Sequence, residues 1–524
     1  RWLIRRHHGA KQNAHNTERL LMNDFQLYSA AACRDIDALA MAPVAEGGMG
    51  LTGQALMQRA AQFALDTLLL LCPQISAISI LCGKGNNAGD GYLVGLLAKQ
   101  LGVEVQIIAV SPTQQLTGDA FEACERVKSL GLVVEKAGTP IRHSTVVDAL
   151  LGTGSVGAPR PNFAAAIVAI NSREGFVLSL DLPSGLNADN GEAFVAVHAD
   201  ATVSFIARKI GLYTGKGPGL CGERLFSDLG VPEKLAKRFD SLSLRWWQSG
   251  LLPELAVDSY KHQLGHVLIV GGCKGMGGAV VLAAEAALRS GAGLVTVATD
   301  PANLPGLLAR LPEAMWVDPL SSDDTRSMQA ALSRASVVVL GPGLGRSAWA
   351  GRVLEVVASY NGPLVIDADG LYWLANQDQR PVLKTMASPL FLTPHAGEAA
   401  RLLNRTVDEV VNQPRQSVID MSRAHNATCL LKGPGTMMGN QHVQTICGHG
   451  NPGMATAGMG DVLAGLVGSF IAQQPNDSES AFCAAVLLHS AAADRAALDT
   501  TERGIIASST IPYIASLLRE EESV

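Results

Sequence analysis

Gly448-His-Gly-Asn-Pro-Gly-Met-Ala-Thr-Ala-Gly-Met-Gly-Asp461 leads directly into the apolar run Val462-Leu-Ala-Gly-Leu-Val-Gly-Ser-Phe470. The pattern predicts a glycine-rich loop that runs into a helix. Backbone N–H groups in the first turn of a helix have no partner within the helix and point outward, with the positive end of the helix dipole behind them. The stretch therefore predicts an anion site that suits a phosphate.

The expected first turn of this helix carries an aspartate, Asp461. A carboxylate repels phosphate, so we interpret it as a base that takes a proton from a hydroxyl beside the phosphate. The alternative is a helix N-cap after a flexible loop, since aspartate is a common cap. Five glycines precede Asp461 in this stretch, which is more than a cap requires and favours the phosphate-and-base interpretation.

Length and composition indicate a globular enzyme with more than one domain. The chain has 524 residues, of which 48% are hydrophobic and 17% charged, and its net charge is −6. A single core rarely extends over so long a chain, so two domains are expected. The negative charge gives no electrostatic support for binding nucleic acid or an anionic membrane. The nine cysteines form no Cys-x-x-Cys pair, which predicts reduced thiols in a cytoplasmic protein without zinc.

Neither the apolar windows nor the first residues predict a membrane span or a signal peptide. The most apolar window, Phe63–Cys82, contains Asp66 and Pro73, so it is expected to form a helix, a turn and a strand. The chain begins Arg1-Trp-Leu-Ile-Arg-Arg-His-His8, which is basic and lacks a long apolar core. We expect residues 1–21 to be an upstream extension or a short transit-like segment, with Met22 as the natural start.

Short apolar strands alternate with helices in both halves of the chain, which predicts parallel sheets covered by helices on both faces. In such sheets ligands bind at the carboxyl ends of strands. In the first half, strands are expected over Ile75–Leu81, Val103–Val110, Val146–Leu150 and Phe176–Asp181, and helices over Tyr92–Leu101, Thr117–Leu130 and Phe163–Asn171. In the second half, strands are expected over His266–Gly271, Gly293–Ala298, Val337–Leu340, Leu364–Asp367, Pro389–Leu392 and Cys429–Lys432, with a helix over Gly278–Arg289.

The alternation lapses over Lys234–Tyr260, which we interpret as a linker or an inter-domain strap. The sequence therefore predicts two α/β domains, over residues 22–240 and 250–524. In the second domain, loops that contain glycine, aspartate or histidine follow successive strands at Gly341–Gly345, Asp367–Gly370, Thr393–Glu398 and Lys432–Thr436. Each loop alone is weak evidence, but together with the Gly448–Asp461 loop they indicate one site.

This half resembles the ribokinase-like superfamily and, within it, the ADP-dependent NAD(P)H-hydrate dehydratases, between about Asp258 and Leu518. The runs Gly341-Pro-Gly-Leu-Gly345, Thr393-Pro-His-Ala-Gly-Glu398, Lys432-Gly-Pro-Gly-Thr436 and Gly450–Asp461 occur in the family's order. The resemblance implies an adenine-nucleotide site at Lys432, Gly433, Pro434, Gly435, Thr436 and Gly460. It implies contacts with the hydrated nicotinamide nucleotide at Ala279, Gly343, His395 and Asp461. The loop Gly272–Ala279 departs from the family's more polar loop, and Ala457 stands in place of a more usual glycine.

The implied reaction uses ADP, with Mg²⁺, to turn a poor leaving group into a good one. Asp461 would activate the ring hydroxyl toward the terminal phosphate of ADP, which becomes AMP. The ring nitrogen would then expel phosphate and restore the double bond.

Oxygen-bearing side chains also follow three strands in the first half. The loop Gly83–Gly91 contains two asparagines and an aspartate, Asp148 ends a second strand, and Asp181 ends a third. Oxygen donors from neighbouring strand ends suit a hard cation beside a phosphate-bearing ligand. The alternative is a set of turns and helix caps made by these same side chains.

This half resembles the NAD(P)H-hydrate epimerase domain over about Tyr28 to Lys237, with a Rossmann-like α/β/α sandwich. The matching runs are Leu56–Ala60, Gly85–Gly91, Asp148–Gly154 and Asp181-Leu-Pro-Ser-Gly185. The resemblance implies K⁺ at Asn87, Asp148 and Ser184, and Asp181 is our candidate for acid/base work. It implies substrate contacts at Asn86, Asn87, Ala88, Gly89, Asp90, Gly152, Thr153, Gly154, Ser155, Val156, Gly157, Ala158 and Asp181.

Together the two resemblances imply nicotinamide nucleotide repair, in which one domain interconverts the R and S hydrates and the other dehydrates the S form. The main alternative is a small-molecule kinase of the ribokinase group fused to a non-catalytic binding domain. Expected partners are the hydrates NADHX and NADPHX and ADP, without nucleic acid or membrane, and we expect a homo-oligomer.

Overall fold

The computed structural model describes residues 24–248, 250–252, 254–321, 325–376 and 389–519. The expected extension over residues 1–21 and the expected start at Met22 lie outside the described residues. The chain divides into two compact α/β units, of which the first contains Gln26–Leu242 and the second contains Phe25 and the described residues from Ser243 onward. The predicted α/β fold class is confirmed for both.

The first unit is built on a seven-stranded sheet in the order β4-β3-β2-β5-β6-β7-β9, and each neighbouring pair is parallel. Its strands are β2 (Ala77–Cys82), β3 (Glu104–Ala109), β4 (Val134–Lys136), β5 (Thr145–Ala149), β6 (Phe176–Leu180), β7 (Ala201–Phe205) and β9 (Glu223–Ser227). A short parallel pair joins β1 (Phe25–Tyr28) to β8 (Arg208–Lys209). The strand order reverses between β2 and β5, so the loops after these strands form the crevice in which such sheets bind ligands.

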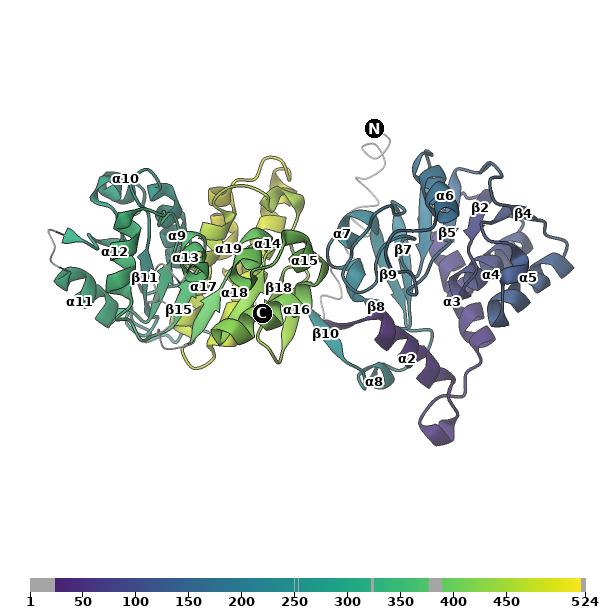
Figure 1. Ribbon diagram of the computed structural model, residues 1–524, viewed down its shortest axis with the longest axis horizontal. Helices are drawn as coiled ribbons and strands as arrows, with labels where there is room; N and C mark the ends of the chain where they lie inside the picture. Colours follow the sequence, from purple (N-terminus) through teal and green to yellow (C-terminus); the bar gives the residue numbers. More distant parts are fainter. Residues whose placement is uncertain (1–23, 249, 253, 322–324, 377–388, 520–524) are drawn as a thin grey trace. The chain divides into compact units, whose positions relative to one another are not determined.

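Helices cover both faces of this sheet (Figure 1). They are α2 (Ala30–Met41), α3 (Gly53–Leu71), α4 (Asn86–Gln100), α5 (Gly118–Ser129), α6 (Pro161–Asn171), α7 (Gly217–Leu220) and α8 (Glu233–Ala236). On β2, Ile78 and Ile80 pack in the larger core with α3 and α4, whereas Leu81 packs with Phe163 and Ile167 of α6. The alternation of side chains along the strand thus divides the apolar core between the two faces.

The start of α4 corrects the sequence prediction. The helix begins at Asn86 rather than at Tyr92, so most of the glycine-rich segment is helical rather than a loop. A Cβ added to Gly91 would lie 2.5 Å from the Cβ of Ala149 on β5. The glycine is therefore explained by close packing of the helix on the sheet rather than by a turn.

The second unit has a mixed sheet in the order β13-β12-β11-β14-β15-β16-β17-β18-β19-β10. Its strands are β10 (Ser241–Arg245), β11 (His266–Val270), β12 (Leu294–Ala298), β13 (Met315–Val317), β14 (Val337–Leu340), β15 (Leu364–Ile366), β16 (Leu390–Leu392), β17 (Ala427–Leu431), β18 (Met437–Gly439) and β19 (Gln444–Cys447). The pairs from β13 to β17 are parallel, as predicted, whereas β18 is antiparallel to both β17 and β19. Here too the strand order reverses, between β11 and β14.

The expected linker over Lys234–Tyr260 was wrong in part, because it contains β10, which pairs in parallel with β19. Leu242 and Leu244 are buried and alternate with more accessible residues, the period of a strand with one covered face. The segment is short and flanked by charged residues, so its periodicity is weak in the sequence.

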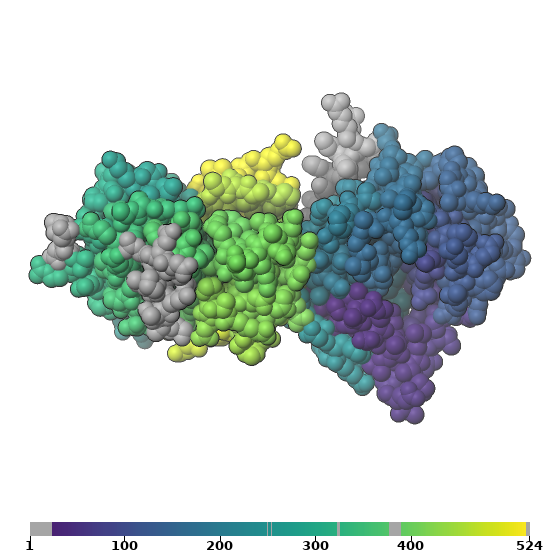
Figure 2. Space-filling view, viewed as in Figure 1, coloured from purple at the N-terminus to yellow at the C-terminus, as the bar shows by residue number. Residues whose placement is uncertain are grey.

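The helices of the second unit are α9 (Gly277–Arg289), α10 (Leu304–Arg310), α11 (Arg326–Arg334), α12 (Ala348–Val357), α13 (Asp369–Ala375), α14 (Ala396–Leu403), α15 (Val407–Asn412), α16 (Pro414–His425), α17 (Met459–Gln473), α18 (Ser478–Asp499) and α19 (Ala507–Arg519). Helices α9 and α17 lie side by side over β11, whose Val267 and Ile269 belong to the same apolar core (Figure 1). In the space-filling view, the yellow C-terminal residues pack on the green part of this unit (Figure 2).

Helix α18 is the one helix among the described residues that is long and apolar enough to cross a membrane, and 72% of its apolar window is buried inside the unit. Phe482, Leu487 and Leu488 of this helix are fully buried in the core around α17. Its apolar composition is therefore accounted for by packing in the core of the unit.

Candidate active sites

The predicted anion loop leads into α17, whose first turn contains Asp461. Gly458 precedes the helix with φ +90°, a left-handed conformation that favours glycine. Burial and the negative charge of Asp367 together raise the pKa of Asp461 to about 6, with Lys432 opposing part of that rise. Asp461 is therefore a carboxylate that exchanges a proton close to neutral pH, as a general base requires.

Lys432 and Asp367 form an ion pair beside this turn. The Nζ of Lys432, at the end of β17, donates to the Oδ1 of Asp367, at the end of β15, over 2.6 Å. Thr393, at the end of β16, donates to the same oxygen over 2.8 Å. A Cβ added to Gly460 would lie 3.2 Å from the Nζ of Lys432. Three neighbouring strand ends thus place a cation against the first turn of α17.

His395 is the N-cap of α14 and has less freedom than the sequence suggests. Its Nδ1 accepts hydrogen bonds from the backbone N–H groups of Gly397 and Glu398 at 3.0 and 3.4 Å, so the ring proton of the neutral form is on Nε2. The Nε2 lies 3.4 Å from a carboxylate oxygen of Glu398. Burial and the nearby Lys432 lower the pKa of His395. The ring is therefore neutral at pH 7, and only its Nε2–H can face a ligand.

Gly343 and Ala279 come together where the strand order reverses. A Cβ added to Gly343 would lie 3.1 Å from the Cβ of Ala279, and Cys273 donates its backbone N–H to the carbonyl of Gly343 over 2.7 Å. The first residue of the less polar loop Gly272–Ala279 is held by a residue outside the loop. The hydroxyl of Thr299 donates to the carbonyl of Gly272 over 2.6 Å. The two residues implied to contact the hydrate are thus neighbours in this unit.

The turn between β17 and β18 contains the remaining residues of the implied nucleotide site. Gly433, Pro434 and Gly435 lie in this turn, and the hydroxyl of Thr436 donates to the carbonyl of Gly433 over 3.1 Å. Lys432 lies between the end of β17 and the turn. Its ammonium and the backbone of the turn are therefore both located at the carboxyl end of β17.

Sequence reasoning missed Asp494 of α18, which holds the start of the anion loop. Its carboxylate accepts from the ring of His449 at 3.2 Å, from the backbone of Gly450 at 3.0 Å and from the side chain of Asn451 at 2.9 Å. Asn451 in turn accepts from the backbone of Gly453. An aspartate on an otherwise apolar stretch of helix was the one available signal, and it does not identify its partners.

In the first unit, Asp181 follows β6 with φ +66° and pairs with Lys209. The Lys209 side chain is buried, and its Nζ also donates to the hydroxyl of Ser204 over 3.2 Å. Burial by itself would lower the pKa of Lys209, but the charge of Asp181 raises it above its ordinary value. Sequence reasoning missed this lysine, which no motif marks.

Two further carboxyl groups lie close enough to this ion pair to feel its charges. Burial raises the pKa of Asp37 to about 6, with Lys209 lowering it and Asp181 raising it. Burial and the charge of Asp181 also raise the pKa of Asp90, one of the implied substrate contacts. Around one ammonium, therefore, two carboxyl groups hold their protons more tightly than an exposed carboxylate does.

Asn87 and Gly152 come together beside Asp181. The Nδ2 of Asn87 donates to the carbonyl of Leu151 over 2.8 Å, but its Oδ1 is buried without a hydrogen-bond partner in the described structure. A Cβ added to Gly152 would lie 3.4 Å from the Cβ of Asn87 and 3.9 Å from a carboxylate oxygen of Asp181. A buried oxygen without a donor is what a bound cation requires.

Asp148 and Ser184 are buried next to this place. The carboxylate of Asp148 accepts from the side chain and backbone of Ser184 at 2.6 and 2.9 Å, from Ser179 at 2.9 Å and from the backbone of Leu150 at 3.2 Å. Burial raises the pKa of Asp148, while these hydrogen bonds oppose that rise. The hydroxyl of Ser184 would have to rotate and give up its hydrogen bond to Asp148 before a cation could bind here. That rotation would leave one oxygen of each residue free to coordinate the cation.

The predicted substrate residues of this unit do not all face the same place. Asn86 to Asp90 lie in the first turns of α4, and Gly152 lies against Asn87. In the loop that follows, containing Thr153, Gly154, Ser155, Val156, Gly157 and Ala158, the side chain of Val156 is 81% exposed. That part of the loop is exposed to solvent.

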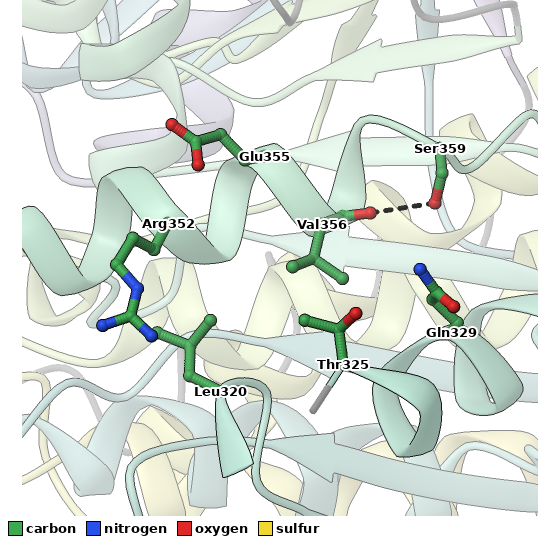
Figure 3. A pocket seen from close by; sticks show the side chains of 7 residues that line it. All are labelled: Leu320, Thr325, Gln329, Arg352, Glu355, Val356 and Ser359. Atoms are coloured by element: carbon green, nitrogen blue, oxygen red, sulfur yellow. Dashed lines mark hydrogen bonds between the residues drawn. The ribbon is translucent and has the colours of Figure 1, made fainter. Parts of the chain in front are cut away.

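The second unit also has a surface hollow of about 320 Å³ between α11 and α12 (Figure 3). It is lined by Leu320, Thr325, Gln329, Arg352, Glu355, Val356 and Ser359. None of the residues singled out in the sequence lines it, so we do not assign it to the site.

Comparisons with known proteins cover both units. A family model described as NAD(P)H-hydrate dehydratase matches residues 267–515, and one described as YjeF-related protein N-terminus matches residues 53–211. The chain is 40% identical to the bifunctional NAD(P)H-hydrate repair enzyme of Coxiella burnetii over 94% of this chain and 99% of that protein. The enzyme of the same name from Escherichia coli is 37% identical over 90% of this chain and 91% of that protein.

A solved ribokinase-like superfamily protein from Enterococcus faecalis is 30% identical, with a TM-score of 0.48, over 53% of this chain and 96% of that chain. The two relatives named above match nearly the whole chain, across both units, at more than 30% identity. The chain belongs to the family of bifunctional NAD(P)H-hydrate repair enzymes.

Proposed function

We propose that this protein repairs hydrated nicotinamide nucleotides with two separate sites. The second unit dehydrates the S hydrate of NADH or NADPH with ADP, which yields AMP and phosphate, and the first unit interconverts the R and S hydrates. The observation that carries the proposal is the group formed by Asp461, Lys432 and Asp367 at the first turn of α17. Membership of the family supports the pairing of the two activities on one chain.

Dehydration proceeds by phosphorylation of the ring hydroxyl and loss of phosphate. Asp461 accepts the hydroxyl proton while that oxygen attacks the terminal phosphorus of ADP, and the bond to the bridging oxygen breaks to release AMP. The lone pair of the ring nitrogen then expels inorganic phosphate, and loss of a ring proton restores the double bond. Lys432 and the N–H groups at the start of α17 stabilise the charge on the transferring group. Mg²⁺ bound to the nucleotide phosphates would offset their negative charge.

Epimerisation needs a group that can both take and give a proton in the first unit. Asp181 has this role in our proposal, and Lys209 holds its carboxylate in place through their ion pair. K⁺ is assigned to Asn87, Asp148 and Ser184, a choice supported by the buried Oδ1 of Asn87 that has no donor. Carbonyl, amide and carboxylate oxygens are the ligands that hard cations prefer.

The test is recovery of reduced-nicotinamide absorbance from a mixture of R and S NADH hydrates with ADP, with ATP or without nucleotide. Complete recovery with ADP is expected from two working sites. Recovery that stops near half, under conditions where spontaneous epimerisation is slow, would refute the epimerase assignment. Accumulation of a phosphorylated product instead of AMP and phosphate would refute the dehydratase and support a kinase.

We also propose that the protein is a cytoplasmic homo-oligomer. All nine cysteines are free thiols, which supports a reducing compartment. Exposed apolar side chains such as those of Leu101 and Val133 support association of subunits. Light scattering on the purified protein would decide the oligomeric state, and a monomeric mass would refute it.

A further inference from the structure

Asp367 is a nearly fully buried carboxylate, with a side chain 2% exposed, at the end of β15. Its Oδ1 accepts both hydrogen bonds described above, from Lys432 and Thr393. Its Oδ2 faces the first turn of α17, where it lies 3.4 Å from the position of a Cβ on Gly460. Sequence reasoning gave this residue no role in the site.

A buried negative charge beside a phosphate site needs an explanation, because it repels the ligand that the turn attracts. The ion pair with Lys432 neutralises part of this charge. Its ammonium has three donors, of which one goes to Asp367, and its side chain remains 24% exposed. The Nζ also lies 3.2 Å from the position of a Cβ on Gly460. The ammonium and the carboxylate therefore both lie next to the first turn of α17, where the N–H groups would hold a phosphate.

We propose that Asp367 is a positioning residue for dehydration, which fixes the ammonium of Lys432 against the first turn of α17 and places a negative charge beside Asp461. The proposal rests on the proposed function of the second unit, since it assumes that the nucleotide phosphate binds at this turn. A fixed cation requires less reorganisation when the charge of the transferring group develops.

Several charged or titratable groups face the Lys432–Asp367 pair. Asp461 faces both members from α17, and its pKa responds to both. His395 and Glu398 face Lys432 from α14, and His489 faces it from α18. Burial lowers the pKa of His489 to about 4, so this ring is neutral at pH 7. With both histidines uncharged, removal of the Asp367 charge should make Asp461 easier to deprotonate.

Asp367→Asn is the direct test, because asparagine keeps the shape and one acceptor oxygen but removes the charge. We expect the ADP dissociation constant, measured by calorimetry, to rise roughly tenfold, since the ion pair that fixes the ammonium of Lys432 becomes a weaker hydrogen bond to a neutral amide oxygen. We also expect the acid limb of the kcat–pH profile to move to lower pH. Unchanged ADP affinity and an unmoved acid limb in a folded variant would overturn the proposal.

Two further variants separate charge from position. Thr393→Val keeps the charge of Asp367 but removes one of its donors, so ADP should bind several-fold more weakly while the acid limb stays in place. This variant also decides the proposal if Asp367→Asn fails to fold, and unchanged ADP affinity would then overturn it. Asp420→Asn is the matched control, because that carboxylate pairs with Arg405 over 2.7 Å elsewhere in the unit, and both readouts should be unchanged.

Failure of the proposed function gives a different result from failure of this inference. If the unmodified protein binds ADP but restores no reduced nicotinamide, the dehydratase assignment is refuted, while the ADP affinities of the variants still decide the role of Asp367. If the unmodified protein binds no ADP, both are overturned.

Discussion

Replacing Gly460 by alanine should weaken ADP binding without destabilising the protein. Gly460 lies in the first turn of α17, and an added Cβ would be 3.2 Å from the Nζ of Lys432 and 3.4 Å from the Oδ2 of Asp367. The contact with the Nζ is tighter than ordinary van der Waals packing and the contact with the Oδ2 is at its lower limit, so the ammonium would have to shift by a few tenths of an ångström. The shift moves the ammonium away from the place where we expect the nucleotide phosphate.

The expected magnitude follows from the interaction that is disturbed. A hydrogen bond to a charged group contributes about 1.5–3 kcal/mol, and a shift of this size removes only part of it. A loss of about 1–2 kcal/mol raises the dissociation constant for ADP about 5- to 30-fold. Alanine in place of glycine favours a helix by up to about 1 kcal/mol. The melting temperature should therefore stay the same or rise by about 2–4 °C.

Calorimetric titration with ADP and a thermal melt of the same samples measure both effects. Gly306→Ala is the matched control, because Gly306 is an exposed residue of α10 and an added Cβ would meet no atom within 4 Å. That variant should gain stability and bind ADP as the unmodified protein does. Undiminished ADP affinity in a folded Gly460→Ala protein would refute the placement of the Lys432–Asp367 pair at the nucleotide.

Three further predictions concern Asp461, Asp181 and Asn87. Asp461 acts as a base only when it is deprotonated, so with a pKa of about 6 the rate of dehydration should fall about tenfold for each pH unit below pH 6. The Asp461→Asn variant should lose turnover at every pH but still bind ADP, and retained turnover would contradict the role of Asp461 as the base. Asp181→Ala should slow R-to-S conversion at least about 100-fold while dehydration of purified S hydrate is unchanged, whereas equal loss of both activities would argue against independent sites. For Asn87→Ala, the extra thermal stability that KCl gives over NaCl should disappear, and no difference between the two salts in the unmodified protein would count against the cation assignment.

Many of the strands could be predicted from the sequence because their apolar residues are buried on both faces. Strand β14 covers Val337–Leu340, as expected, and all four of its residues are buried. Helix α9 begins within one residue of its expected start. Each of these elements is decided by local composition, and parallel pairing then brings the loops after the strands to one edge of the sheet. Because the motif loops of the second unit follow these strands, their approximate positions could be predicted as well.

Other parts of the fold could not be predicted, because packing decides them. The glycines of α4 are typical of a loop in the sequence, but Gly91 is required by the close approach of the helix to Ala149. Strands β18 and β19 are short and antiparallel, and in the sequence they lie within a stretch dominated by turn residues. The bonds of Asp494 to the anion loop join residues more than 40 positions apart along the chain. No local pattern contains that information.

The two sites share an arrangement of charges that no motif in the sequence marks. In the second unit, Lys432 pairs with Asp367, and the pKa of the nearby Asp461 is raised to about 6. In the first unit, Lys209 pairs with Asp181, and the pKa of Asp37 is likewise raised to about 6.

In each unit the carboxyl groups outnumber the ammonium groups in a region with little water, so one carboxyl group remains without a full countercharge. That group holds its proton more tightly than an exposed carboxylate and exchanges it near neutral pH, which is the property that proton transfer needs. The excess arises only when helices and strands that are distant in the sequence pack side by side. A motif can therefore identify the loop that binds a phosphate, but the proton affinity of the base beside it is a property of the folded sheet.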